Sequence, residues 1–179
     1  MKVDFEALSL EDLAGLVSEK LKEHGIDGVL VGGACVSIYT HNQYQSYDLD
    51  YVTHQNMKNV ATALSELKFQ RKGNVFTHQH SKFFIEFVAP PVAIGDEPIH
   101  HFSNHKTPLG TIKMLTATDS VKDRLASFYH WNDHQSLEQA VLICKDQTNN
   151  INMREIKRWS EKEGFSDQFN TFRMETHKL

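Results

Sequence analysis

The sequence is poor in cysteine: only Cys35 and Cys144 occur, and neither has a second cysteine at the spacing of a CxxC motif. Such motifs are typical of structural zinc sites and of thiol–disulfide enzymes. The sequence therefore indicates neither a structural zinc site nor a thiol–disulfide enzyme. We expect both thiols to be buried as small apolar side chains, Cys35 beside a glycine pair and Cys144 within an apolar helical stretch.

Long apolar runs are also missing. No stretch approaches the roughly 20 residues that a membrane span needs, and residues 1–10 contain two acids and no apolar run that resembles a signal peptide. The formal net charge of −4 argues against a protein that coats nucleic acid. We therefore expect a cytoplasmic protein without a membrane partner, in which at most a local basic patch guides an acceptor strand.

The chain does have enough apolar content for a continuous core. Of its 179 residues 40% are hydrophobic, and no repeat or linker-like stretch interrupts it. The pattern changes to helical segments near Gly110. We therefore predict an α/β (α+β) protein with a core over residues 1–112 and a helical subdomain over residues 113–179 that packs on the core.

Hydrophobic periodicity and glycine positions predict the elements of the core. Apolar residues recur at helical spacing after Ser9, which can cap a helix that ends near Glu23. The other expected elements are strands over 28–33, 48–52 and 82–88 and helices over 34–39 and 56–67. Residues 90–108 contain prolines, a glycine and histidines, and we expect mostly loop there, with at most one short strand.

The second part of the chain is expected to be helical. Thr118 or Asp119 can cap its first helix, and a second helix is expected over 136–145, with two more before the C-terminus. The first of these helices has an apolar face at helical spacing, formed by Val121, Leu125 and Phe128.

Two aspartates in the strand over 48–52 carry the first chemical signal. Asp48 and Asp50 stand at i and i+2, so on a strand both carboxylates point to the same face, with Cα atoms about 6.6 Å apart, while Leu49 points into the core. Two carboxylates this close repel each other unless a cation relieves the conflict. Hard oxygen ligands select Mg²⁺ or Mn²⁺ over Zn²⁺ or Cu²⁺.

Two further features complete the pattern. Glu86 lies amid aromatic residues in the strand over 82–88 and needs a partner, which a metal at Asp48 and Asp50 would supply. The pair Gly32-Gly33 lets backbone N–H groups approach a phosphate closely. Each feature alone is more often an ordinary turn, cap or exposed strand position. Their ordered combination is much less frequent by chance.

The ordered set resembles the nucleotidyltransferase superfamily over roughly residues 25–90, specifically small bacterial members similar to abortive-infection (AbiEii-like) toxins. Its motifs are Gly32-Gly33, then Ser46-Tyr47-Asp48-Leu49-Asp50, then Phe84-Ile85-Glu86-Phe87. The resemblance implies a nucleotidyltransferase fold with a mixed β-sheet core, flanking helices and a C-terminal helical subdomain. It also implies the transfer of an NMP from an NTP to a hydroxyl acceptor, with release of pyrophosphate.

The resemblance also implies roles for individual residues. Gly32-Gly33 and Ser46 would contact the nucleotide phosphates. Asp48 and Asp50 would hold Mg²⁺ or Mn²⁺, and Glu86 would help to bind the metal and deprotonate the acceptor hydroxyl. The acceptor could be RNA such as a tRNA end, a protein or a small molecule, and an antitoxin-like protein is a further expected partner.

Weaker signals follow the core. The stretch over 119–125 resembles the helical segment that follows the catalytic core in those relatives, and Lys122 or Arg124 could reach the triphosphate. A solvated helix face is about equally compatible, and we take Lys122 as a candidate nucleotide-binding residue. Tyr129 and Trp131 could stack on a base, but aromatic residues of an amphipathic helix are more often core, so we predict core positions for both.

Two other functions are compatible with the sequence. The chain could be a catalytically silent nucleotidyltransferase-fold protein that binds nucleotide or a partner in a toxin–antitoxin type system, although intact Asp48, Asp50 and Glu86 weigh against silence. It could also be a histidine-dependent metal hydrolase. Against that hypothesis, no HExxH or Cys/His pattern is formed by the histidines at 78, 80, 100, 101 and 105.

Overall fold

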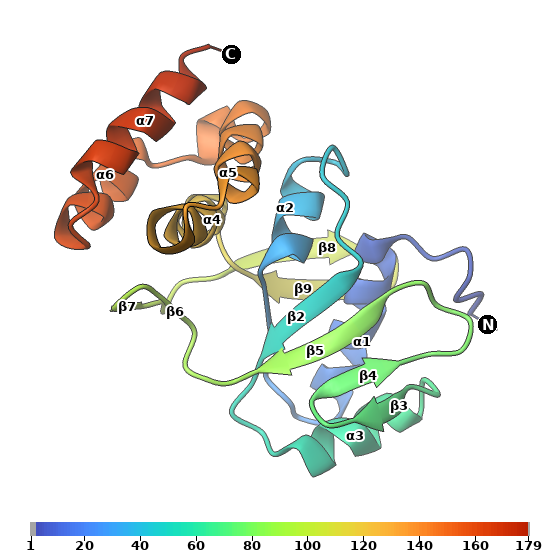
Figure 1. The fold of residues 1–179 in the computed structure, drawn as a ribbon. Coiled ribbons are helices and arrows are strands. Elements are labelled where there is room, and N and C mark those ends of the chain that lie inside the picture. Colours follow the sequence, from blue (N-terminus) through green and yellow to red (C-terminus); the bar gives the residue numbers. More distant parts are fainter. Residues whose placement is uncertain (1–2, 179) are drawn as a thin grey trace.

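The computed structural model describes residues 3–178, which form an α/β core followed by a helical half (Figure 1). The elements of the core are α1 (Leu10–Glu23), β1 (Val29–Val31), α2 (Gly33–Tyr39), β2 (Asp48–Val52), α3 (Met57–Ser65), β3 (Gln70–Lys72), β4 (Val75–Thr77), β5 (Phe84–Val88), β6 (Ala93–Ile94), β7 (Glu97–Pro98), β8 (Ser103–Thr107) and β9 (Gly110–Met114). Those of the helical half are α4 (Ala117–Trp131), α5 (His134–Asp146), a 3₁₀ turn (Thr148–Asn150), α6 (Met153–Lys162) and α7 (Ser166–Thr176).

The described residues contain one large mixed sheet of seven strands in the order β3-β4-β5-β2-β1-β9-β8. β2 pairs in parallel with β5, and β1 pairs in parallel with β9, whereas the other neighbours are antiparallel. β6 and β7 form a separate ribbon. The predicted fold class, a mixed sheet with flanking helices and a C-terminal helical part, is confirmed.

Helix α1 packs on the sheet through its apolar stripe. Ser9 caps the helix as predicted, because its Oγ accepts a hydrogen bond from the Asp12 N–H at 3.0 Å. The Tyr51 side chain of β2 is buried in this layer, and its hydroxyl donates to the Ala14 carbonyl at 3.0 Å. The stripe is buried, with its members Leu13, Ala14, Val17 and Leu21 no more than 1% exposed.

The helical half lies next to α2 and the β6–β7 ribbon, away from α3 (Figure 1). α5 ends beside the end of α2, where Gln147 Nε2 donates to the Tyr39 carbonyl at 2.9 Å. In α6, Trp159 is fully buried and stacks on Tyr129 of α4, and its Nε1 donates to the Ile94 carbonyl of β6 at 3.3 Å. These contacts fasten the helical half to the core at two separate places.

A buried ion-pair network also ties α4 to β7 and α6. The Lys122 side chain is 1% exposed, and its Nζ lies 2.9 Å from Glu97 Oε1, 3.3 Å from Asp119 Oδ1 and 3.4 Å from Glu155 Oε1. Arg158 Nη2 also contacts Glu97, at 2.8 Å. A buried ammonium group is tolerated only with such partners, so Lys122 is committed to this junction.

The segment before the helical half contains more strand than the sequence predicts. The expected loop over 90–108 holds β6, β7 and β8, and β9 follows after a tight turn. β8 is polar and lies at the edge of the sheet, so it lacks the apolar alternation on which strand prediction depends. The expected boundary between residues 112 and 113 falls inside β9, and the helical half begins at α4.

The predicted helices of the helical half are confirmed, but the predicted cap of the first one is wrong. The cap of α4 is Thr116, whose Oγ1 accepts from the Asp119 N–H at 3.1 Å, and not Thr118 or Asp119. α5 and two further helices are present as predicted.

Cys35 is buried, whereas Cys144 is only partly buried. No helix within residues 3–178 has the length and apolar character needed to cross a membrane.

The network around Glu97 predicts a specific acid sensitivity. Although burial opposes ionisation, hydrogen bonds from Arg158 and Lys122 lower the pKa of Glu97 to about 2. Its stabilising contribution is therefore present above the ordinary pKa of 4.5 and is lost as the pH falls towards 2. We expect the free energy of unfolding, measured by urea titration, to decrease less steeply over this range in Glu97→Gln than in the wild type. Equal slopes would contradict the assignment.

Candidate active site

β2 and β5 place three carboxylates on one face of the sheet. Leu49 and Tyr51 are 0% exposed, whereas Asp48 and Asp50 alternate with them and are partly exposed. In the parallel register Asp50 lies opposite Glu86 of β5. Because neighbouring strands are about 4.8 Å apart, the carboxylate of Glu86 reaches the same region as those of the two aspartates. The structure therefore places the three acids that the sequence singles out on one face of two neighbouring strands.

The glycine turn after β1 lies directly against these acids. Gly32 has φ +69°, and a Cβ built on it would stand 2.6 Å from Asp50 Oδ2. A side chain at this position would thus be strained by the backbone and would collide with the carboxylate. Gly33 follows as the first residue of α2, and a Cβ there would meet Ser46 Oγ at 3.3 Å. The glycine pair allows the turn, Asp50 and Ser46 to share a small volume.

Ser46 holds the first aspartate in position. Its side chain is buried, and its Oγ donates to Asp48 Oδ1 at 2.6 Å. Its own backbone N–H donates to Ser37 Oγ of α2 at 2.8 Å. The structure thus places Ser46 beside the acids, with a hydroxyl that orients a carboxylate.

The electrostatics of the site are unfavourable without a cation. Burial, followed by the negative charges of Asp48 and Glu86, raises the pKa of Asp50 from its ordinary value to about 7. The positive charge of Arg124 opposes this shift only in part. The site therefore has an excess of negative charge, which a bound divalent cation would neutralise.

The donor set fits a hard divalent cation, although it is not fully gathered. Within residues 3–178 no three His, Cys, Asp or Glu side chains converge closely enough to form a ready metal cluster. Glu86 Oε1 instead accepts a hydrogen bond from Asn74 Nδ2 at 3.2 Å. Carboxylate oxygens from Asp48, Asp50 and Glu86 are the ligands that Mg²⁺ or Mn²⁺ prefers. A rotation of the Glu86 side chain away from Asn74 would complete such a set.

The cation whose charge reaches this face of the sheet belongs to Arg124 and not to Lys122. The Arg124 guanidinium is largely buried, with Nη2 2.5 Å from Asp123 Oδ2 and Nη1 3.5 Å from Gln139 Oε1 of α5. Residues 122 and 124 point about 200° apart around a helix. The structure therefore does not bring Lys122, which faces Glu97, to the acids. Both residues were candidates for contact with the triphosphate, because the sequence alone does not show which side of the helix faces the sheet.

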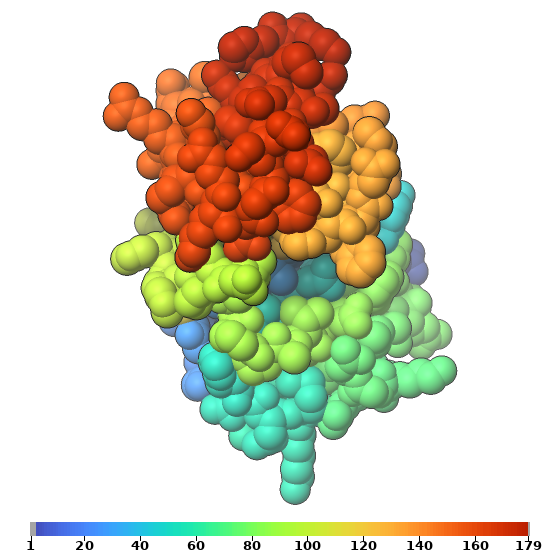
Figure 2. All heavy atoms as spheres, turned by 60° about the vertical axis from the view of Figure 1, so that its left-hand side comes forward, coloured from blue at the N-terminus to red at the C-terminus, as the bar shows by residue number. Residues whose placement is uncertain are grey.

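Helix α4 of the helical half lies near the acid face of the sheet, since the charges of its Arg124 and Asp123 act on Asp50. Figure 2 shows a hollow between the orange and red helices and the cyan and green core, and the atoms at its base have the blue and teal colours of β1 and β2. The site is therefore bordered by the sheet on one side and by the helical half on the other. Such a position between two parts of a chain is typical of substrate sites.

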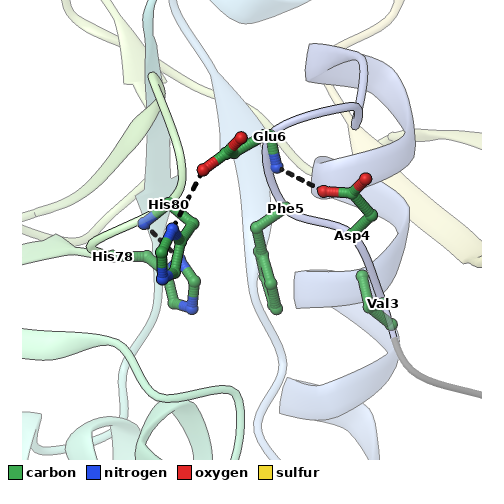
Figure 3. A pocket seen from close by; sticks show the side chains of 6 residues that line it. All are labelled: Val3, Asp4, Phe5, Glu6, His78 and His80. Atoms are coloured by element: carbon green, nitrogen blue, oxygen red, sulfur yellow. Dashed lines mark hydrogen bonds and ion pairs between the residues drawn. The ribbon is translucent and has the colours of Figure 1, made fainter.

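The histidines that suggested a metal hydrolase do not gather around a common centre. His105 Nε2 contacts Glu11 Oε1 at 2.6 Å, far along the chain from His78 and His80. Figure 3 shows His78 and His80 beside the N-terminal segment, where Glu6 Oε1 lies 3.0 Å from His80 Nδ1. This pocket of 430 Å³ contains none of the three acids, since it is lined by Val3, Asp4, Phe5, Glu6, His78 and His80.

These histidine contacts have a structural explanation. The Phe5 ring stacks on His78 with centroids 3.9 Å apart, and burial lowers the pKa of His78. The His78 ring and the Glu6–His80 pair hold the N-terminal segment against the loop before β5. With no third ligand among the described residues, the structure gives no support to the histidine-dependent hydrolase.

The contact between Gly32 and Asp50 predicts a difference between two glycine substitutions. Gly73 has φ +67° with nothing within 4 Å of a built Cβ, so Gly73→Ala tests backbone strain alone. We expect it to lower the free energy of unfolding by about 1–2 kcal/mol. Gly32→Ala also forces the Asp50 carboxylate to move aside and should lower it by roughly 1 kcal/mol more. Thermal or urea unfolding of both variants measures the difference, and equal losses would argue against the close contact.

The charge repulsion predicts that one acid destabilises the metal-free protein. Asp50→Asn removes a charge opposite Glu86 and should raise the free energy of unfolding in EDTA by about 1 kcal/mol. The exposed Asp96 provides a matched control, since Asp96→Asn changes the same charge away from the site. A loss of stability in Asp50→Asn with no change in the control would show that the surroundings stabilise the charged carboxylate of Asp50.

Two solved structures have a similar fold. A crystal structure of an antigenic nucleotidyltransferase-like protein from Paracoccidioides brasiliensis gives a TM-score of 0.56 at 12% identity, covering 76% of this chain and 75% of that chain. The solution structure of the antibiotic-resistance factor ANT(2'')-Ia gives 0.52 at 10% identity, covering 95% and 97%. No family model and no curated protein matches the sequence. The chain therefore has the fold of nucleotidyltransferase-like proteins.

Proposed function

We propose that the chain is a metal-dependent nucleotidyltransferase that transfers an NMP from an NTP to a hydroxyl acceptor and releases pyrophosphate. The observation that carries the proposal is the arrangement of Asp48, Asp50 and Glu86 on one sheet face in contact with the Gly32 turn. The shared fold supports it. The toxin-like subtype, the antitoxin-like partner and the nature of the acceptor, whether RNA, protein or small molecule, stay expectations from the sequence resemblance.

The three acids have distinct roles in this proposal. Asp48 and Asp50 hold Mg²⁺ or Mn²⁺, and Ser46 keeps Asp48 in the orientation to do so through its 2.6 Å hydrogen bond. When bound, the metal supplies neutralisation of the charge that develops on the transferred phosphoryl group. Glu86 accepts the proton of the acceptor hydroxyl as the acceptor oxygen attacks the α-phosphate, and the bond to pyrophosphate breaks.

Residues around the acids bind the triphosphate. Gly32-Gly33 leaves backbone N–H groups free of side chains on the side of Asp50, and a phosphate can approach them closely. Arg124 takes the part that the sequence assigned to Lys122. Its partner Asp123 neutralises it in the free protein, and a triphosphate would compete with Asp123 for the guanidinium group.

The proposal is tested first by nucleotide binding. We expect wild-type protein to bind NTPs in calorimetry when Mg²⁺ is present and to lose this binding in EDTA. An Asp48→Asn, Asp50→Asn double variant should lose Mg²⁺-dependent binding, because the metal then has one carboxylate instead of three. The Asp96→Asn variant, which changes a charge elsewhere on the surface, should bind as the wild type does.

A transfer assay separates an enzyme from a silent fold. Label in the α-phosphate of an NTP should appear in an acceptor fraction of RNA, protein or small molecules, whereas label in the γ-phosphate should leave with pyrophosphate. Nucleotide binding without transfer to any of these fractions would favour the catalytically silent alternative. Absence of Mg²⁺-dependent binding by the wild type would refute a metal-nucleotide site altogether.

A further inference from the structure

Trp131 is a large apolar side chain that the fold leaves in water. It is 82% exposed at the end of α4, whereas the other tryptophan, Trp159, is 0% exposed and Tyr129 is 7% exposed. The predicted core position is therefore correct for Tyr129 and wrong for Trp131. Aromatic side chains gain more than most residues from leaving water, so an exposed tryptophan with no packing role is a candidate for ligand contact.

The lengths of α2 and α5 indicate where the end of α4 lies. α2 has 7 residues and α5 has 13, about 10 Å and about 20 Å long. Their C-terminal ends are joined, since Gln147 binds the Tyr39 carbonyl and Gln43 contacts Asp146. α5 also packs along α2, and Figure 1 shows the two side by side. The start of α5, and Trp131 just before it, therefore extends past the start of α2, where Gly32 and the acids lie.

Trp131 lies on the same face of α4 as Arg124. The two residues are seven positions apart, which is about 10 Å along the helix and only about 20° around it. Arg124 is the cation whose charge acts on Asp50. The face of α4 therefore presents a positive group near the acids and an aromatic ring two turns farther out. This order matches a nucleotide, which has phosphates at one end and a planar base at the other.

The backbone at Trp131 is held firmly. Asn132 caps α4 in the left-handed conformation with φ 52°, and Asp133 then caps α5 by accepting hydrogen bonds from the Gln135 and Ser136 N–H groups at 3.0 and 3.3 Å. Because the turn is fixed from both sides, stacking on Trp131 would require the ordering of little more than one side chain. Such preorganisation favours binding.

We propose that Trp131 is the platform on which the base of the bound NTP stacks. The inference rests on the proposed function, because the phosphates of the same NTP must lie at Asp48 and Asp50. Stacking on a single ring uses the face of the base and not its hydrogen-bonding edge. We therefore expect the site to accept different bases, with purines bound more tightly than pyrimidines.

Tryptophan fluorescence tests the proposal directly, because the chain has one exposed and one buried tryptophan. A stacked base quenches an indole, so Mg-ATP should reduce the long-wavelength emission of the wild type by more than half. Mg-tripolyphosphate, which has the phosphates but no base, should leave the emission nearly unchanged while still binding in calorimetry. Trp131→Phe should remove the quenching but retain most of the ATP affinity, since phenylalanine still offers a ring.

The affinity of the Trp131→Ala variant for Mg-ATP tests whether the base stacks on Trp131. Loss of one stacking contact should weaken Mg-ATP binding by roughly 5- to 100-fold and leave Mg-tripolyphosphate binding unchanged. Met174→Ala, which removes another exposed apolar side chain from the helical half, is the matched control. Wild-type ATP affinity in Trp131→Ala would overturn the inference and leave the proposed function intact. Quenching by a short single-stranded RNA but not by Mg-ATP would also overturn the inference. If the wild type bound neither Mg-ATP nor Mg-tripolyphosphate, both the inference and the proposed function would be refuted.

Discussion

The parallel pairing of β2 with β5, in the register that sets Asp50 opposite Glu86, is the constraint around which the site is arranged. The register is fixed on the other face, where Leu49, Tyr51, Ile85 and Phe87 are no more than 4% exposed. A slip of one residue would expose these side chains and bury the acids. Core packing therefore holds three carboxylates close together against their mutual repulsion, and the raised pKa of Asp50 is the electrostatic consequence.

Each neighbour of the acids makes room for a carboxylate or donates a hydrogen bond to one. Gly32 has no side chain where Asp50 Oδ2 needs room, Ser46 donates a hydrogen bond to Asp48, and Asn74 donates one to Glu86. None of these contacts removes the excess charge. Hydrogen bonds thus orient the carboxylates, and in the proposed function a divalent cation would supply the missing interaction. The grouped carboxylates therefore reduce stability as long as no cation neutralises them.

Helix α4 connects the two parts of the chain and has a different role on each side. One side carries Lys122, whose buried amine joins Glu97, Asp119 and Glu155 and fixes the helix to β7 and α6. The opposite side carries Arg124, whose charge acts on Asp50, and the exposed Trp131. Because the Lys122 network fixes the rotation of α4, it also determines where the side chains on the opposite side of the helix point.

The sequence by itself determined the acid site and the outline of the fold. Asp48 and Asp50 share a face because strand side chains alternate, and the glycine pair, the Ser9 cap and the apolar stripe of α1 follow from local rules. These features depend on neighbours within a few residues. The edge strand β8 was missed because its polar residues carry little local signal, and its pairing with β9 is a contact between segments.

Only the tertiary structure decided where the charged and aromatic side chains of α4 lie. Lys122 and Arg124 are two positions apart and equally basic, and the packing of α4 alone sends one to a buried network and the other towards Asp50. The same holds for Trp131, which an amphipathic pattern assigns to the core and the α4–α5 turn leaves in water. Helix rotation and the position of a turn are set by long-range packing, and no short stretch of sequence encodes them.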